Sequence, residues 1–173
     1  MMRLFAGLFC LTATVSAAIS PVFAESPVVS EAPLNAKIER SAAKGIEFLK
    51  NRGQADDGSF SGETGAAVTA LCVNAILQHR PQAINDPVIE KALAFISSKF
   101  QSDGGIYATG SSHQNYETSV AIGALVRANK GGRYDSALKR AETFLKGLQW
   151  DEGEGIESSD PSYGGAGYGS HKR

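Results

Sequence analysis

The sequence holds few of the side chains on which metal and redox chemistry depend. Its 173 residues include two cysteines, three histidines and one tryptophan. Cys10 lies in an N-terminal apolar segment, and Cys72 lies in an apolar helical run with only His79 nearby as a second metal ligand. We therefore expect no cofactor, no metal site and no internal disulfide, and we expect Cys72 to be a small buried apolar residue.

An excess of either charge is also lacking. The 17 basic and 18 acidic residues give a formal net charge of −1. Because the chain has no excess of positive charge, its composition does not favour binding to nucleic acid or a polybasic contact with a membrane. Apolar residues make up 42% of the chain and charged residues 20%, which suits one modest folded domain.

No apolar run is long enough to span a bilayer with ease. The longest, Leu4 to Ile19, has 16 residues, against the roughly 20 that a membrane helix needs. It follows Arg3 and precedes Val22-Phe23-Ala24, with small residues at the −3 and −1 positions. This pattern predicts a signal peptide over residues 1–24, cleaved after Ala24, and a secreted or periplasmic protein with no transmembrane segment after cleavage. The alternative is an uncleaved membrane anchor. Residues 25–35, with two prolines, are predicted to be a linker.

What is present is an internal repeat over residues 36–173. Three segments share a basic residue, an apolar helix with a central phenylalanine, a glutamine and an acidic, glycine-rich turn: Lys44–Phe60, Lys91–Tyr107 and Arg140–Ile156. The phenylalanines at 48, 95 and 144 are 47 and 49 residues apart, and the glutamines at 54, 101 and 149 are 47 and 48 apart. A near-constant period indicates a stack of similar structural units.

Two further helical runs separate the repeated segments. Thr64–Leu77 and Thr118–Ala128 are apolar or small on almost every face, so we predict that they are buried on all sides. The repeated segments are amphipathic. Alternating buried and amphipathic helices predict two concentric layers, and hence an all-α fold of the α/α toroid type. No stretch alternates with period two, so no sheet is expected.

The first repeated segment resembles a known motif. Lys44-Gly45, Phe48-Leu49, Gln54, Gly58 and Phe60 are similar to the QW motif of squalene-hopene and oxidosqualene cyclases. The run from Tyr116 also looks like the inner repeats of the cyclase and prenyltransferase family. We expect the turn residues to fasten neighbouring hairpins and to have no catalytic role. They are Gln54, Gly58, Phe60, Gln101, Gly104, Tyr107, Gln149 and Gly153.

The resemblance implies isomerase or transferase chemistry, but the sequence lacks the groups for it. The cyclases protonate an alkene with an Asp-x-Asp-Asp motif, and the nearest string, Gln54 to Asp57, lacks the first aspartate. Zinc-dependent prenyltransferases need three or four ligands. We assign no catalytic residue, and we expect the acidic residues between Asp151 and Asp160 to form a solvated loop. Tyr116 and Glu117 are candidates for lining a central cavity, with helix capping and packing as the alternative.

The repeat count predicts an incomplete toroid. The family closes its ring with five to seven hairpins, whereas this sequence supplies two and one further outer helix. We expect a non-catalytic binding or scaffolding toroid, or a fragment of one. Its partner would be an apolar or isoprenoid ligand, or a protein that completes the ring. Two alternatives stay open: a terpenoid cyclase or prenyltransferase with its catalytic part outside this chain, and a secreted polysaccharide-active α/α barrel using Glu63 and Glu117.

Overall fold

The computed structural model describes residues 31–170. The predicted signal peptide and cleavage site lie outside these residues, as do residues 25–30 of the predicted linker. Residues 31–35, also predicted as linker, are instead the first turn of a helix. Pro33 is tolerated there because the first N–H groups of a helix have no partner within it.

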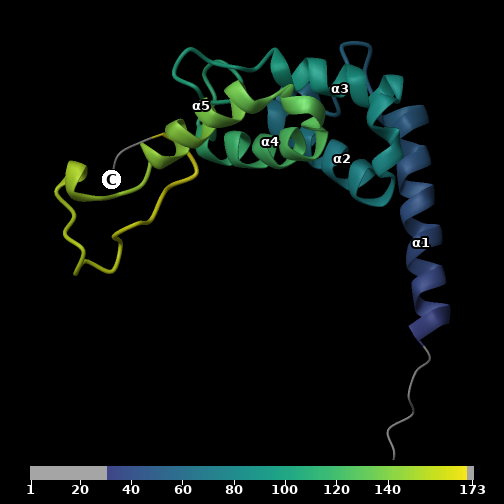
Figure 1. The fold of residues 1–173 in the computed structure, drawn as a ribbon, viewed down its shortest axis with the longest axis horizontal. Coiled ribbons are helices and arrows are strands. Elements are labelled where there is room, and N and C mark those ends of the chain that lie inside the picture. The colour runs from purple at the N-terminus through teal and green to yellow at the C-terminus, as the bar shows by residue number, and fades with distance from the viewer. Residues whose placement is uncertain (1–30, 171–173) are drawn as a thin grey trace, which may run out of the picture.

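The described chain is all-α. Its helices are α1 (Glu31–Phe48), α2 (Ala66–His79), α3 (Pro87–Ser97), α4 (Gln114–Ala128) and α5 (Asp135–Lys146) (Figure 1). Shorter helical turns lie between and after them, at Leu49–Gly53, Gly62–Thr64, Pro81–Asn85, Lys130–Gly132 and Glu152–Glu154. Within residues 31–170 the β-structure is limited to one isolated bridge, between Phe100 and Ile106.

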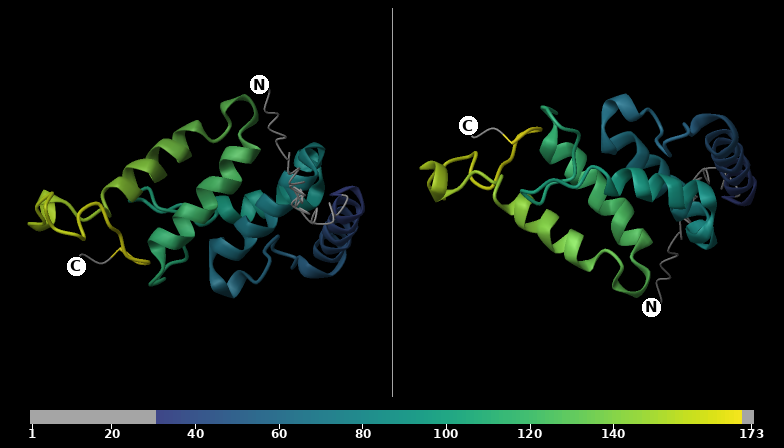
Figure 2. Two further views of the ribbon diagram at one scale, coloured as in Figure 1. Left: turned by 90° about the horizontal axis from the view of Figure 1, so that it is seen from below. Right: turned by 90° about the horizontal axis from the view of Figure 1, so that it is seen from above.

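α2 and α4 form a central pair, and the other helices pack on one or other of them. α2 and α4 lie side by side, α3 packs on α2, and α5 packs on α4 (Figures 1 and 2). α1 meets α2 near its own C-terminal end, where Ile46 joins the core, and its N-terminal half projects beyond the other helices (Figure 1). Each helix predicted as outer thus contacts one helix of the central pair.

The central helices are buried on the faces that meet but not on every face. Small residues such as Ala70, Ala121 and Ala124 are fully buried between them. In contrast, Leu71 of α2 is 47% exposed and Val126 of α4 is 57% exposed. The prediction of burial on all sides was therefore wrong. Each central helix is covered by its partner and by the outer helix that packs on it, but no residue of 31–170 covers the sides that carry Leu71 and Val126.

A closed backbone turn follows the first two outer helices. The N–H of Ala55 donates to the carbonyl of Ser59 over 2.9 Å, and that of Gln101 donates to Gly105 over the same distance. Inside each turn an aspartate, Asp57 or Asp103, accepts from the N–H two residues later, again at 2.9 Å. Ala55 and Gln101 therefore occupy equivalent positions in the two turns. The sequence alignment had instead paired Gln54 with Gln101, which is one residue off.

A buried threonine ties each turn to the following central helix. The N–H of Phe60 donates to Thr69 Oγ1 over 3.0 Å, and the N–H of Ile106 donates to Thr118 Oγ1 over 2.9 Å. Both threonines are fully buried. A buried N–H needs an acceptor, so the hydroxyl fixes where the chain enters the core.

A glycine in each turn touches the backbone of the next outer helix. Gly58 and Gly104 have φ values of +87° and +96°, which favour glycine. A Cβ on Gly58 would collide with the carbonyl oxygen of Lys91, and one on Gly104 would lie 2.8 Å from that of Arg140. Lys91 and Arg140 are the basic residues of the second and third repeats. The turns therefore set the distance from one hairpin to the next.

The same turn occurs a third time, divided by an insertion. The N–H of Trp150 donates to the carbonyl of Gly165, and the N–H of Gly164 donates to that of Trp150, both over 2.8 Å. The φ of Gly164 is +76°, which is positive like those of Gly58 and Gly104. The sequence alignment put Gly153 in this turn, but Gly153 lies in the inserted segment. Its N–H donates instead to the side chain of Asp151 over 2.8 Å.

The side chains of the three repeat glutamines donate to carbonyl groups of their turns, and Gln54 and Gln149 donate to equivalent glycines. Gln54 Nε2 donates to the carbonyl of Gly58 over 3.0 Å, and Gln149 Nε2 donates to that of Gly164 over 3.3 Å. Gln54 also reaches the carbonyl of Val88 in α3, at 2.8 Å. Gln101, one position later in its turn, donates to Tyr107 over 2.7 Å. Only Gln54 therefore bridges to the next outer helix directly.

We expect Thr69→Val and Thr118→Val each to lower the free energy of unfolding by about 1–3 kcal/mol, because each leaves a buried N–H without its acceptor. Urea unfolding followed by circular dichroism measures this. The control is Thr143→Val, since the exposed Thr143 hydroxyl donates only to the carbonyl of Lys139. Its effect should stay within about 0.5 kcal/mol. Equal effects at all three positions would contradict the anchoring role.

Candidate functional site

A groove of about 770 Å³ lies at the N-terminal ends of the two central helices. Its lining comes from the segment before α2, the long segment before α4, the first turns of both helices, and the C-terminal segment. The lining residues are Glu63, Thr64, Gly65, Ala67, Val68, Ala108, Thr109, Gly110, Ser111, Ser112, His113, Tyr116, Glu117 and Tyr168. The groove therefore joins parts of the chain that are far apart in sequence.

Glu117 is the buried acidic group of this groove, with 3% of its surface exposed. Its Oε2 atom accepts from the N–H of Ala66 over 2.9 Å and from the N–H of Ala108 over 3.1 Å. The hydroxyl of Ser111 donates to Oε1. Ala66 is the first residue of α2, so the carboxylate caps that helix and offsets the positive end of its dipole.

Gly65 makes this cap possible. Its φ is +81°, and a Cβ at this position would overlap the carboxylate of Glu117. A side chain would therefore both strain the backbone and displace the cap. The glycine lets the start of α2 approach a residue of α4 directly.

The C-terminal segment caps α4 in a comparable way. The N–H of Tyr116 donates to the carbonyl of Tyr168 over 3.1 Å, and Asn115 Nδ2 donates to the carbonyl of Gly167 over 2.6 Å. The rings of Tyr116 and Tyr168 have centroids 5.6 Å apart, and His113 meets Tyr168 edge-on at 6.1 Å. All three rings are exposed. They form an aromatic cluster on one side of the groove.

The structure brings both predicted cavity residues to this groove. Tyr116 presents an exposed ring to it, whereas the contacts of Glu117 are those of a helix cap. Glu63 also lines the groove and is exposed. Sequence reasoning missed Tyr168 and Ser111, because their contacts with α4 depend on how two long loops return to the helix. The tyrosine- and glycine-rich composition near Tyr168 was the signal available.

Other predicted turn residues lie away from the groove. Phe60 is buried in the core. Tyr107 packs against Phe144 of α5, with centroids 5.7 Å apart, and its hydroxyl donates to Asp103. Desolvation, together with the hydrogen bond and the charge of Asp103, raises the pKa of Tyr107 to about 12. These contacts fasten the second turn to α5.

Residues 31–170 contain no cluster of three or more histidine, cysteine, aspartate or glutamate side chains able to hold a metal ion. In the acidic loop, Asp151 and Glu154 instead cap the turn Glu152–Glu154 reciprocally. Cys72 is partly buried against the core, and desolvation raises the pKa of its thiol. Among the described helices, none has the length and apolar character required to cross a membrane.

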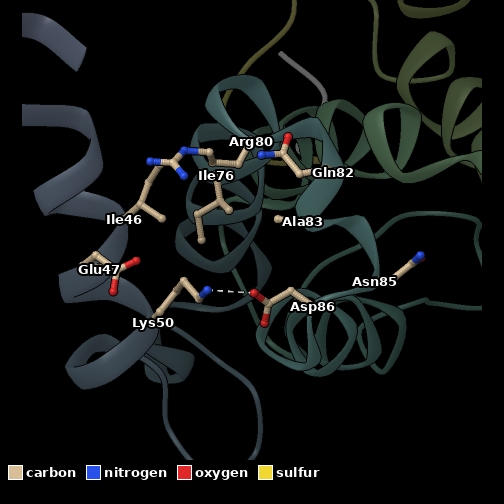
Figure 3. A pocket seen from close by; sticks show the side chains of 9 residues that line it. All are labelled: Ile46, Glu47, Lys50, Ile76, Arg80, Gln82, Ala83, Asn85 and Asp86. Carbon is tan, nitrogen blue, oxygen red and sulfur yellow. Dashed lines mark ion pairs between the residues drawn. The ribbon is translucent and has the colours of Figure 1, made fainter. Parts of the chain in front are cut away.

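A second hollow, of about 390 Å³, lies at the opposite end of α2. Figure 3 shows Lys50 pointing toward Asp86 across it, and the two form an ion pair of 2.8 Å. Asp86 also accepts from the N–H of Val88 and so caps α3. The bond from Lys50 lowers the pKa of Asp86, and Asp86 raises the pKa of Lys50. The polar groups here fasten the end of α1 to the start of α3.

Comparison with known proteins finds no family model, curated protein or solved structure that matches this chain. The groove at the start of α2 and α4 is where exposed aromatic rings, hydroxyl groups and a carboxylate come together. The aromatic rings and Glu63 are exposed there, whereas Glu117 is bonded to the protein through both oxygens.

We expect Glu117→Gln to lower the free energy of unfolding by about 1.5–3 kcal/mol, because it removes a charged acceptor from buried N–H groups. Thermal and urea unfolding measure the loss. Glu63→Gln is the matched control, since Glu63 lines the same groove but is exposed, and its effect should stay within about 0.5 kcal/mol. An unchanged stability for Glu117→Gln would show that the carboxylate does not hold the two helices together.

Proposed function

We propose that this protein is an exported, non-catalytic repeat protein, a partial α/α toroid that binds a ligand in the groove at the N-terminal ends of α2 and α4. The two-layer packing and the three equivalent turns support the toroid geometry, because a constant contact from one hairpin to the next produces a regular stack. The signal-peptide pattern of residues 1–24 supports export.

The observation that carries the proposal is that both carboxylate oxygens of Glu117 are hydrogen-bonded to the protein. A general acid needs a proton that it can deliver to a substrate atom within hydrogen-bonding reach. Both oxygens of Glu117 instead accept hydrogen bonds from the protein, from Ala66, Ala108 and Ser111. Glu63 is exposed to water and is not enclosed in a dry pocket with a second acidic group. These contacts favour binding over catalysis.

The lining favours a ligand that has both an apolar face and hydroxyl groups, as a glycan has. The exposed rings of Tyr116 and Tyr168 offer flat apolar surfaces next to their polar hydroxyls. The hydroxyls of Thr64, Thr109 and Ser112 lie along the same groove. An isoprenoid chain would gain little here, because it needs an enclosed apolar pocket to leave water.

We expect a neutral oligosaccharide to shift the amide resonances of residues 108–117 and 168 in a titration followed by nuclear magnetic resonance. Tyr168→Ala should weaken binding about tenfold, because it removes one stacking face. The matched control is Tyr163→Ala, an exposed tyrosine outside the groove whose hydroxyl bonds to Glu152. It should leave the affinity unchanged.

Two results would overturn the proposal. One is the absence of any shift in the groove across a panel of neutral and acidic oligosaccharides. The other is turnover of squalene or of an allylic diphosphate by the purified protein, which would show that it is an enzyme acting on isoprenoids.

A further inference from the structure

The groove at the N-terminal ends of α2 and α4 is acidic. The described residues that line it include two carboxylates, Glu63 and Glu117, but neither a lysine nor an arginine. His113 is the one member of this lining that can carry a positive charge. Over the whole chain, by contrast, basic and acidic residues are almost equal in number, at 17 and 18. The groove therefore favours a cationic ligand over an anionic one, although the chain as a whole is almost neutral.

The two carboxylates differ in how much of their charge remains for a ligand. Glu117 is buried, and both of its oxygens accept hydrogen bonds from the protein. Because it also offsets the positive end of α2, much of its charge is compensated within the fold. Glu63 lies in the short turn Gly62–Thr64 before α2, is exposed, and forms no ion pair within residues 31–170. The charge of Glu63 is therefore available to a ligand.

Two tyrosine rings in the same lining also attract cations. Tyr116 is 39% exposed and Tyr168 is 70% exposed, and their ring centroids are 5.6 Å apart. The face of an aromatic ring carries partial negative charge, so a cation placed over it is attracted. The same face can stack on the apolar side of a sugar ring. The tyrosines can therefore contact both a sugar and a positive group attached to it.

We propose, on the basis of the glycan-binding function above, that the groove selects glycans with protonated amino groups, such as oligomers of glucosamine. The sugar rings stack on Tyr116 or Tyr168, and their hydroxyl groups meet those of Thr64 and Thr109 along the groove. The ammonium groups interact with the carboxylate of Glu63 and with the tyrosine faces.

The charge of the glycan decides its affinity in this scheme. A neutral glycan keeps the stacking and hydroxyl contacts but has no group that Glu63 attracts. An acidic glycan brings a second negative charge toward the same carboxylate, and the described lining offers it neither a lysine nor an arginine. The order of affinity is therefore amino, then neutral, then acidic.

A matched set of ligands tests selection by charge. It consists of a glucosamine oligomer, its N-acetylated counterpart and a glucose oligomer, all of one length and linkage, titrated into the protein by calorimetry at a pH at which the amines are protonated. We expect the glucosamine oligomer to bind about tenfold more tightly than either neutral oligomer. This ratio should fall toward one in about 1 M salt, because screening then acts over roughly 3 Å.

A pair of variants tests the role of Glu63. Glu63→Gln removes the charge and keeps the size of the side chain, so the ratio of amino to neutral affinity should fall to about twofold or less. Glu90→Gln is the matched control, because Glu90 is an exposed carboxylate of α3 outside the groove. Its ratio should equal that of the parent protein. Circular dichroism establishes that each variant is folded.

The outcomes separate selection for amines from glycan binding itself. Equal affinities for charged and neutral oligomers would overturn the selection and leave glycan binding in place, as would a ratio that Glu63→Gln does not change. A simple diamine that binds as tightly as the glucosamine oligomer would also overturn it, because the sugar would then contribute nothing. Absence of binding by all the oligomers would overturn both proposals.

Discussion

The rest of the structure depends on a short turn that brings glycine against the backbone of the next helix. Gly58 and Gly104 approach the carbonyl oxygens of Lys91 and Arg140 so closely that no side chain fits between them. A buried threonine hydroxyl holds the other side of each turn. The glycine contact is made by backbone atoms, so it fixes the distance between hairpins, and the threonine side chain holds each turn against the following central helix.

The same contact is incomplete at both ends of the described helices. Gly164 closes a third turn, yet no described atom beyond its immediate surroundings lies within 4 Å of where its Cβ would be. At the other end, Phe48 of α1 is exposed, so no turn within residues 31–170 covers this side of the helix. Each end therefore holds one half of a contact that is complete twice in the middle. A unit of this kind can gain stability by associating with another unit.

Periodicity was enough to predict the helices and their order, because alternating amphipathic and apolar runs leave few other arrangements. The periodicity did not locate the third turn. An insertion between Trp150 and Gly164 moves the turn glycine, Gly164, farther along the chain than the repeat spacing predicts. Hydrophobicity also overstated the burial of Leu71 and Val126, because it does not tell whether a neighbour is present. Of the groove, Tyr116 and Glu117 were found from their place at the start of a central helix. Tyr168 was not, because its contact depends on the path of a loop.

The central claim is that the third turn repeats the backbone hydrogen bonds of the first two. Amide hydrogen exchange tests it most directly, since a hydrogen-bonded amide exchanges only when its structure opens. The account predicts that the amides of Trp150 and Gly164 are protected to within about tenfold of those of Gln101 and Gly104, their counterparts in the second turn. Exchange of Trp150 and Gly164 at the rate of an unstructured peptide, with Gln101 and Gly104 protected, would contradict it.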